Sequence, residues 1–485
     1  MGAMVTAVDR NEENAVSKVV AMLKELVHRG NHAHGVATPN SVRIAKTIEE
    51  LYAEKAQSNI ALGHNLSQVV ERDHSQPVLG DDFALVFEGR MFPSPDMSEV
   101  DHVLKELKGD PQKKAKSIIE RFDGSYVFAI AQADNIIVGR DCLGATPLYF
   151  GSNKTTFAVA SEKKALWALG VENAKSFPPG NLAVINAQGF AFQPIKTVVQ
   201  PPIESMKLEM AAKHLQHVLL ESVRERIADG KKLSVAFSGG LDSSVIAALA
   251  KACKADVELV SVGLKDQPEM RHVRAAAEEL KLPLHLQTYT IDDVKDALAK
   301  VLWLIEEPDP VKASIAVALY WAAEAASKLG CKVILTGQGG DELFGGYHRY
   351  LRIYARFGAA RVREAMHRDI SLTHCMNLQR DNKVCAFHQV ELRLPFIDEK
   401  VVRFSTCLPV SLKIESAEDN LRKRILRRVA QDLGIPLFIA KKPKRAIQYA
   451  TGVDKALRKL ARQEGLNLQE YVREIFREAY PNVSV

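Results

Sequence analysis

Short runs of β-branched and aromatic residues recur through the first two hundred positions of the chain. One amphipathic stretch comes before them: Val16, Val20, Leu23 and Val27 recur at helical spacing, and Gly30 ends it. The later runs are FALVFEGR at 83–90, SYVFAI at 125–130, NIIVG at 135–139, TTFAVA at 155–160 and LAVINA at 182–187. Because turn residues separate several of these runs, they predict strands and a strand-rich α+β domain.

A proline-containing segment, QPIKTVVQPPIE at 193–204, follows. Proline disfavours helix at its own position and at the preceding one, so this segment predicts an extended link. The chain therefore divides near residue 200, into a domain at 1–200 and a second one at 205–485.

Strands and helices alternate in the second part. Leu208, Leu215, Leu219, Val223 and Ile227 predict an amphipathic helix. Strand-like runs follow at 232–237, 257–264, 282–290 and 332–337, with helical stretches between them, and the chain beyond about 350 has a mostly helical pattern. This alternation predicts an α/β domain with a parallel sheet, helices on both of its faces and a helical tail.

Composition narrows the class of protein. The chain has 485 residues, 65 basic against 59 acidic side chains, and six cysteines without a CxxC pair. A zinc site and a disulfide framework are therefore not expected. The longest mostly apolar run, at 313–326, is too short to span a bilayer. We expect a soluble, cytoplasmic protein without a membrane or nucleic-acid partner.

The sequence LSVAFSGGLDSSVIAALA at 233–250 leads from a strand through a glycine turn into a helix. Gly239 and Gly240 let the backbone approach a phosphate, and the helix start and the serines supply donors. The Walker lysine and spacing are absent. Asp242 would repel a phosphate unless a cation lay between them, so it suggests a magnesium ligand.

Three motifs together resemble the asparagine synthetase family. SGGLDSS is similar to the pyrophosphate loop of enzymes that adenylate a substrate with ATP. VILTGQGGDELFGGYHRY at 333–350 and VELRLPFID at 390–398 resemble the family's synthetase domain. DGSYVFAIAQADNIIVGRDCLGATPLYF at 123–150 resembles its glutamine-hydrolysing domain. The resemblance implies an N-terminal Ntn-hydrolase-like αββα sandwich and a doubly wound, adenine nucleotide α-hydrolase-like C-terminal sheet.

The resemblance also implies roles for single residues. Residues expected to bind ATP are Ser238, Gly239, Gly240, Asp242, Ser243, Val262, Thr336 and Gly337. Asp242 and Asp341 would hold Mg²⁺, and Lys444 would neutralise charge on the phosphates. The implied reaction activates aspartate as an acyl-adenylate, releases pyrophosphate, and lets ammonia, or glutamine as its source, give asparagine and AMP. Members of the family often dimerise, but the sequence does not decide whether this chain forms a homodimer.

Two departures concern the glutaminase half. The family uses a cysteine directly after the initiating methionine, whereas this chain begins Met1-Gly2-Ala3 and has no cysteine before Cys142. One cysteine between Met1 and Gly2 would restore the family's start. Glu88 stands where the family has the asparagine that stabilises an oxyanion, and a carboxylate there would repel that charge. Asn65 stands where the family usually has arginine. We expect a glutaminase-like domain that is inactive.

A third departure is Gln338, which replaces a glutamate credited with helping ammonia attack. An amide can position ammonia but cannot take its proton. If another acid substitutes, the candidates are Glu306, Glu307, Asp309 and Asp381.

Several alternatives remain open on the sequence. An adenylating enzyme with an internal amine as acceptor, as in relatives that close a β-lactam ring, would have tyrosine in place of Gln338. A silent nucleotide-binding regulator fits Gln338 but not the intact loop, Asp341 and Lys444. A nucleic-acid modifier would need RNA-binding motifs. His28, His32 and His34 lack the spacing of helical zinc ligands, and the basic stretch 421–431 is interpreted as a solvated helix face.

Overall fold

The computed structural model describes residues 2–11, 14–52, 57–228, 232–481 and 483, so Met1 of the predicted family start lies outside the described residues. The chain divides into two compact units, one that ends at Thr197 and a second at Val198–Pro481. Within the described residues, no helix combines the length and the apolar character needed to cross a membrane. All six cysteines are free thiols.

The first unit contains two antiparallel sheets. The seven-stranded sheet has the order β11-β9-β10-β1-β4-β2-β3 and the six-stranded sheet the order β13-β12-β8-β7-β6-β5. The strands are β1 (Ala3–Asp9), β2 (Ala33–Thr38), β3 (Ser41–Ala45), β4 (Ile60–Leu66), β5 (Val78–Leu79), β6 (Ala84–Met91), β7 (Gly124–Ala131), β8 (Ile136–Arg140), β9 (Tyr149–Ser152), β10 (Thr156–Ala160), β11 (Lys175–Ser176), β12 (Asn181–Asn186) and β13 (Gly189–Pro194). The helices are α1 (Ala15–Glu25), η1 (Val27–Arg29), α2 (Ile48–Tyr52), α3 (Glu99–Glu106), α4 (Pro111–Arg121) and α5 (Lys163–Trp167).

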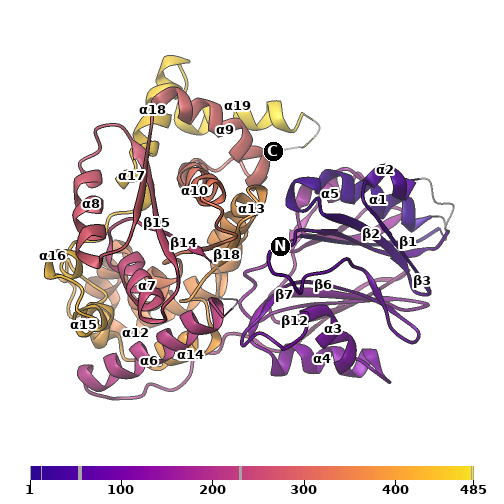
Figure 1. The fold of residues 1–485 in the computed structure, drawn as a ribbon, viewed down its shortest axis with the longest axis horizontal. Helices are drawn as coiled ribbons and strands as arrows, with labels where there is room; N and C mark the ends of the chain where they lie inside the picture. Colours follow the sequence, from indigo (N-terminus) through magenta and orange to yellow (C-terminus); the bar gives the residue numbers. More distant parts are fainter. Residues whose placement is uncertain (1, 12–13, 53–56, 229–231, 482, 484–485) are drawn as a thin grey trace. The chain divides into compact units, whose positions relative to one another are not determined.

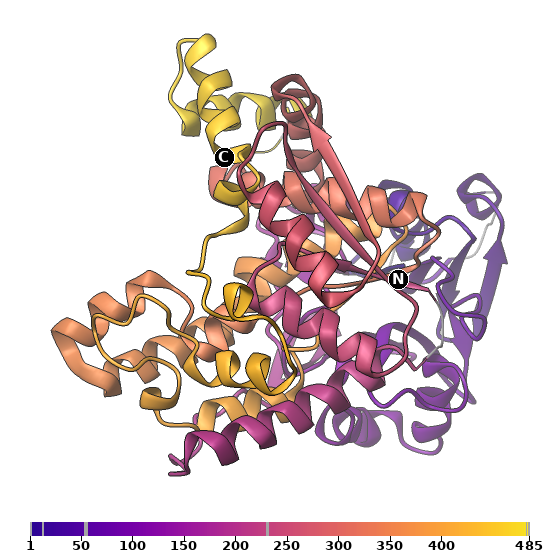
Figure 2. The same ribbon diagram turned by 60° about the vertical axis from the view of Figure 1, so that its left-hand side comes forward.

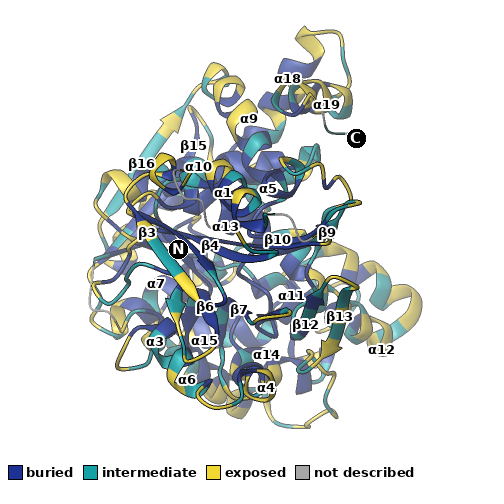
Figure 3. Cartoon of the chain, turned by 90° about the vertical axis from the view of Figure 1, so that its right-hand side faces the viewer, coloured by how far each residue is buried: buried dark blue, intermediate teal, exposed yellow. Residues whose placement is uncertain are grey.

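Successive side chains of a strand point to opposite faces of its sheet, and this alternation builds the layers of the unit. In β1, Ala3, Val5 and Ala7 pack with α1, while Met4 and Val8 pack into the apolar core between the two sheets. Leu85 and Phe87 of β6 belong to a third apolar layer, which they share with α3 and α4. The result is an αββα sandwich, as predicted (Figure 1). Its central strands are buried, and the edge strand β3 is partly exposed (Figure 3).

The second unit is built on a parallel sheet with strand order β16-β15-β14-β17-β18. Its strands are β14 (Leu233–Ala236), β15 (Val257–Leu264), β16 (Leu284–Tyr289), β17 (Val333–Leu335) and β18 (Glu391–Arg393). Its helices are α6 (Leu208–Arg226), α7 (Leu241–Ala252), α8 (Glu269–Leu280), α9 (Ile291–Ile305), α10 (Pro310–Lys328), α11 (Gly340–Phe344), α12 (His348–Thr373), η2 (His374–Leu378), α13 (Gln379–Phe387), α14 (Glu399–Cys407), η3 (Val410–Leu412), α15 (Arg424–Asp432), α16 (Leu437–Ala440), α17 (Ile447–Ala450), α18 (Val453–Gln463) and α19 (Leu468–Ala479).

The order of the parallel strands positions the candidate site. The chain runs from β14 outward to β15 and β16, and then returns to β17 on the other side of β14. Helices α7 and α8 cover one face of the sheet and α10 covers the other (Figures 1 and 2). The predicted doubly wound sheet is therefore confirmed. In such sheets, ligands bind beyond the carboxyl ends of the strands where the order reverses, here between β14 and β17.

Two details differ from the sequence interpretation. The segment beyond residue 350 is helical except for β18, which pairs in parallel with β17. The basic stretch 421–431 does not form one helix, because Arg422 and Lys423 both have positive φ and α15 starts only at Arg424. This turn directs Lys423 into the protein, where its side chain is 2% exposed, so the interpretation of 421–431 as a solvated helix face is wrong for this residue.

Candidate nucleotide site

The glycine turn after β14 is folded against the start of α7. Gly239 has a φ of +64°, which favours glycine, and Gly240 is the N-cap of α7 without a side-chain cap. The Ser238 and Ser243 hydroxyl oxygens lie 3.1 Å apart, and the Ser238 N–H donates to Ser243 Oγ at 3.2 Å. No described side chain caps the first N–H groups of α7, and N–H groups at a helix start can bind an anion.

The segment after β17 packs directly on this turn. A Cβ on Gly337 would lie 2.7 Å from Cβ of Asp242, and one on Gly340 would lie 3.0 Å from the Asp242 carboxyl carbon. Only glycine allows these approaches. The predicted residues Thr336, Gly337 and Asp341 thus lie beside Asp242 at the carboxyl edge of the sheet. Val262 lies near the carboxyl end of β15, the other neighbour of β14.

Two carboxylates and two ammonium groups meet at this edge. Lys423 Nζ lies 2.7 Å and 2.6 Å from the two carboxylate oxygens of Asp242, and 2.5 Å from Oδ1 of Asp341. Lys444 Nζ lies 2.8 Å from Oδ2 of Asp341 and 3.9 Å from Oδ2 of Asp242. The structure therefore brings together the predicted residues Asp242, Asp341 and Lys444, together with Lys423, which the sequence analysis missed.

Electrostatics in this group are strong. Burial alone would raise the pKa of Asp341, but Lys423 and Lys444 hold it well below its usual range. Burial alone would lower the pKa of Lys444, but Asp341 and Asp242 raise it. Asp341 is therefore ionised at neutral pH, and Lys444 is protonated. Glu342 differs, since burial and the charge of Asp341 raise its pKa.

Arg427 links the two segments that carry the lysines. Its Nε donates to the Arg422 carbonyl at 2.6 Å, and its guanidinium also donates to the carbonyl oxygens of Leu421, Ala440 and Lys442. One buried side chain thus connects the turn before α15 with the segment that leads to Lys444. No local sequence signal predicts this arrangement, because it joins carbonyl groups as far apart in the chain as Leu421 and Lys442.

The two aspartates fit the predicted magnesium site. Oxygens of both carboxylates lie 2.5 to 2.7 Å from one point, which the Lys423 ammonium occupies. Carboxylate oxygens are the donors that Mg²⁺ prefers, with further ligands from phosphate and water. Asp242 and Asp341 are thus a suitable pair of protein ligands for an ion that arrives with a nucleotide.

The acids considered as substitutes for a base at Gln338 all have other partners. Glu306 pairs with Lys383 and Glu307 with Lys312, and Asp309 caps α10. Asp381 lies 2.7 Å from Arg380, and burial raises its pKa. Gln338 donates its backbone N–H to Thr336 Oγ1 at 3.4 Å. Within the described part of the chain, no hydrogen bond or ion pair joins Gln338 to any of the four acids.

The predicted oxyanion position in the first unit is occupied by a buried carboxylate. Glu88 accepts the Gly2 N–H at 2.5 Å and lies 3.0 Å from His64 Nε2. A Cβ on Gly2 would lie 2.0 Å from the Asn65 carbonyl oxygen. Asn65 instead bonds the Leu23 carbonyl and His34. Position 2 therefore has no room for a side chain.

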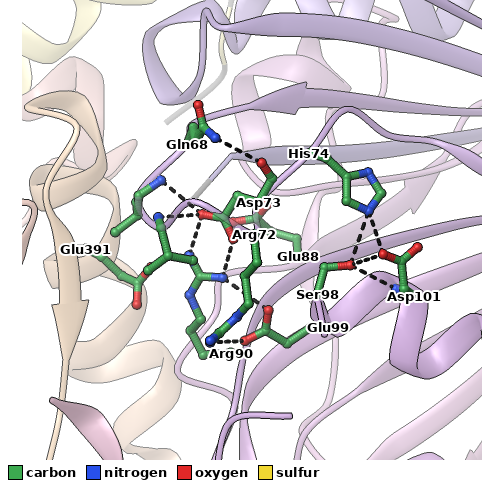
Figure 4. A network of polar contacts seen from close by, with 12 residues as sticks. Gln68, Arg72, Asp73, His74, Glu88, Arg90, Ser98, Glu99, Asp101 and Glu391 are labelled. Carbon is green, nitrogen blue, oxygen red and sulfur yellow. Dashed lines mark hydrogen bonds and ion pairs between the residues drawn. The ribbon is translucent and has the colours of Figure 1, made fainter. Parts of the chain in front are cut away.

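The pocket beside Glu88 is lined by the Arg90 guanidinium, which is already paired with acidic side chains. Arg90 makes two bonds to Asp73, at 2.5 Å and 2.7 Å, and Nη1 lies 3.2 Å from Glu99 (Figure 4). His64 and Ser98 also line this pocket. His28, His32 and His34 turn to different partners, Glu162, the Gln68 N–H and Asn65.

The fold defines a two-domain protein with an αββα sandwich and a doubly wound parallel sheet. Residues 214–360 and 354–481 match the family model described as asparagine synthase, and residues 64–168 match the one described as glutamine amidotransferase domain. The chain belongs to the asparagine synthase family.

Two curated relatives have names of the same family, and one solved structure is similar over part of the chain. The chain is 30% identical over 92% of its length to a Methanocaldococcus jannaschii protein named "Putative asparagine synthetase [glutamine-hydrolyzing] 1", of which 93% is covered. It is 27% identical to Escherichia coli asparagine synthetase B [glutamine-hydrolyzing], over 70% of this chain and 63% of that one. A glutamine phosphoribosylpyrophosphate amidotransferase from B. subtilis, solved with ADP and GMP, matches with a TM-score of 0.36 and 18% identity over 59% of this chain and 65% of that one.

Proposed function

We propose that the chain is an ATP-dependent amide-forming ligase that activates aspartate and uses free ammonia to make asparagine, AMP and pyrophosphate. The observation that carries this proposal is the meeting of Asp242, Asp341, Lys423 and Lys444 beyond β14 and β17. Two carboxylates and two ammonium groups lie together there. When ATP binds, its phosphates would replace the carboxylates as partners of the two ammonium groups. The domain predicted at residues 205–485, which the second unit contains as far as Pro481, would carry this activity.

The turn would bind and orient ATP. Gly239, Gly240 and the first N–H groups of α7 would donate to the phosphates, with Ser238 and Ser243 beside them. Thr336 and Gly337 would line the nucleotide on the β17 side and Val262 on the β15 side. Mg²⁺, when bound by Asp242 and Asp341, would neutralise phosphate charge.

The two lysines would act on the reacting phosphates. With ATP in the turn, the ammonium groups of Lys423 and Lys444 would shift from the aspartates toward the pyrophosphate that leaves as the substrate carboxylate attacks the α-phosphate. Fixed cations aimed at developing charge in a partly buried site are among the largest contributions to catalysis. Gln338 would position ammonia beside the acyl-adenylate, and it would not accept the proton.

The domain predicted at residues 1–200, which corresponds to the first unit, would be a silent glutaminase-like domain. Glu88 places negative charge where an oxyanion would form, and Arg90 lines the pocket beside it, paired with Asp73 and Glu99. Each of these features opposes glutamine hydrolysis. Ammonia would therefore reach the second unit from solution.

The experiment is a pyrophosphate-release assay with ATP, Mg²⁺ and aspartate, run with ammonium or with glutamine. We expect pyrophosphate, AMP and asparagine in equal amounts with ammonium, and no asparagine with glutamine. Release with another carboxylate but not with aspartate would change the substrate and keep the chemistry. ATP binding without pyrophosphate release from any carboxylate would contradict the proposal and indicate a regulatory nucleotide-binding protein.

A further inference from the structure

A second cluster of cations lies in the ATP-binding unit and takes no part in the proposed reaction. Lys413, which follows η3, is only 4% exposed. Its backbone N–H bonds the Val410 carbonyl, but no described residue accepts a hydrogen bond from its ammonium group or pairs with it. A charged group buried without a partner is costly, so this position requires an explanation.

The surroundings of Lys413 add a second cation and no counter-charge. Arg363 of α12 donates through Nη2 to the carbonyl oxygens of Pro201 and Thr406, while its buried Nε has no partner. His367 Nε2 lies 3.1 Å from the Val198 carbonyl. Arg363 is close enough to lower the pKa of Lys413, although less than burial does. The two groups therefore form a like-charged pair.

The only acid that lines the same cavity is Glu342, among the residues that the structure describes. Its Oε1 accepts bonds from Tyr347 at 2.6 Å and from Asn377 at 3.0 Å. Burial and Asp341 raise its pKa, which favours the neutral acid. Among the described residues, no ion pair joins Glu342 to Lys413, and no other acid lines this cavity.

The cavity between these groups is small. Lys413, Arg363, His367, Gln200, Thr406 and Glu342 supply its polar lining, with apolar side chains around them. Its free space is of the order of one water molecule, which is too little for a phosphate or an organic acid. A small monovalent anion in this cavity would compensate the positive charge of Lys413 and Arg363, which both line it.

We propose that this cavity is a binding site for a small monovalent inorganic anion, chloride being representative, held between Lys413 and Arg363. The ion would neutralise the pair and stabilise the second unit. Glu342 lines this cavity, and the preceding residue, Asp341, belongs to the candidate nucleotide site. The anion site would therefore lie close to the nucleotide site along the chain.

Thermal unfolding tests this site without any need for catalysis. Wild-type protein is compared in sodium chloride and in sodium gluconate at equal ionic strength, because gluconate is too large for the cavity. We expect the midpoint in chloride to be higher by about 2–4 °C. The Lys413→Met variant, which keeps the apolar stem, should lose this difference. Lys459→Met, which removes an exposed lysine of α18, should retain it. An equal chloride effect in wild type and Lys413→Met, or none in wild type, would overturn the proposal.

Crystals grown in sodium bromide give a direct readout. Bromide scatters anomalously, so an anomalous peak within hydrogen-bonding distance of Lys413 Nζ in the wild type supports the site. The same map for Lys413→Met should be empty at this position. An ordered water with no anomalous signal in wild-type crystals would overturn the proposal even if the unfolding midpoints differ.

Discussion

The ammonium group of Lys423 lies between both carboxylate oxygens of Asp242, at 2.7 Å and 2.6 Å. Lys423 follows Asp242 by 181 residues, and it reaches the aspartate only because Arg422 and Lys423 both take the left-handed conformation. The contact joins the glycine turn after β14 to the turn before α15. The candidate nucleotide site is therefore built from residues near both ends of the second unit.

Replacing Lys423 by methionine should abolish most of the pyrophosphate release. The variant removes a buried cation next to the reacting phosphates, and it leaves Asp242 and Asp341 facing each other without it. We expect kcat for pyrophosphate release with ammonium to fall by about 10²–10³-fold. The exposed Lys459→Met is the matched control and should retain wild-type activity. A Lys423→Met protein that is folded and within about threefold of wild type would show that this contact is only structural.

Arg427 is a positioning residue in this scheme, because it contacts carbonyl groups and not the phosphates. Arg427→Gln should release the segments that carry Lys423 and Lys444, and should lower kcat by about 10-fold or more, with a smaller effect on KM for ATP. Arg428→Gln is the control on the same helix, since Arg428 is partly exposed and pairs with Asp432. A loss of stability alone would lower the amount of folded enzyme but not kcat per folded molecule. The comparison of the two variants therefore uses kcat per folded molecule. Equal kcat values for the two variants would contradict the positioning role.

The sequence predicted the parallel sheet because its main strands are continuous β-branched or leucine-rich runs, as in VELVSVGL for β15. It missed β18, whose three residues begin with Glu391 and end with Arg393, a pair 2.6 Å apart that has the polarity of a loop. It also missed β1, which contains two alanines and a methionine, and β4, which contains alanine, glycine and histidine. These strands exist because their neighbours bury them, and local propensity does not report that.

The predicted site was recovered in part for a similar reason. Asp242 and Asp341 follow strands β14 and β17, so the strand pattern alone places them at one edge. Lys423 has no such signal. Its position depends on the conformation of the turn and on the Arg427 contacts, and both are set by tertiary structure. The four acids considered as substitutes for a base make other contacts, and local sequence does not predict those contacts.

Gln338→Glu should separate the two half-reactions. A carboxylate at this position could take a proton from attacking ammonia, whereas the amide cannot. We expect asparagine formation with ammonium to become about 10-fold faster, and ATP–pyrophosphate exchange with aspartate, which reports adenylate formation, to change little. Gln338→Leu should slow amide formation and spare the exchange reaction. Unchanged product rates in both variants would show that Gln338 does not contact ammonia.

Gly2→Cys should not create a glutaminase. The added Cβ would lie 2.0 Å from the Asn65 carbonyl oxygen and 3.0 Å from Glu88 Oε2, so the strand must shift and the thiol would face a carboxylate. Overpacking of this kind costs about 1–3 kcal/mol. We therefore expect a lower unfolding midpoint and no release of glutamate from glutamine. Ser17→Cys, on a partly exposed part of α1, controls for the extra thiol. Glutamate release by Gly2→Cys alone would contradict the silent assignment of the first unit.

Stability should rise with pH above neutrality because of Lys413. Burial, with a smaller contribution from Arg363, lowers the pKa of this lysine from 10.5 to about 7. Between these values the unfolded chain binds a proton that the folded chain does not. The free energy of unfolding therefore increases with pH in this window, by at most about 1.4 kcal/mol per pH unit. Below pH 7 both states are protonated, and the full cost of burying the charge remains.

Lys413→Met isolates this contribution, because it removes the titrating group and keeps most of the side chain. In gluconate, the variant should be more stable than wild type at pH 7, and the difference should shrink as pH approaches 10. Urea unfolding at pH 7, 8.5 and 10 measures it, with Lys459→Met as the control that shows no pH-dependent difference. The other groups near Lys413 are Arg363, His367, Cys407 and Glu342, and the variant retains all of them. A difference between Lys413→Met and wild type that stays constant over this pH range would therefore contradict the lowered pKa of Lys413.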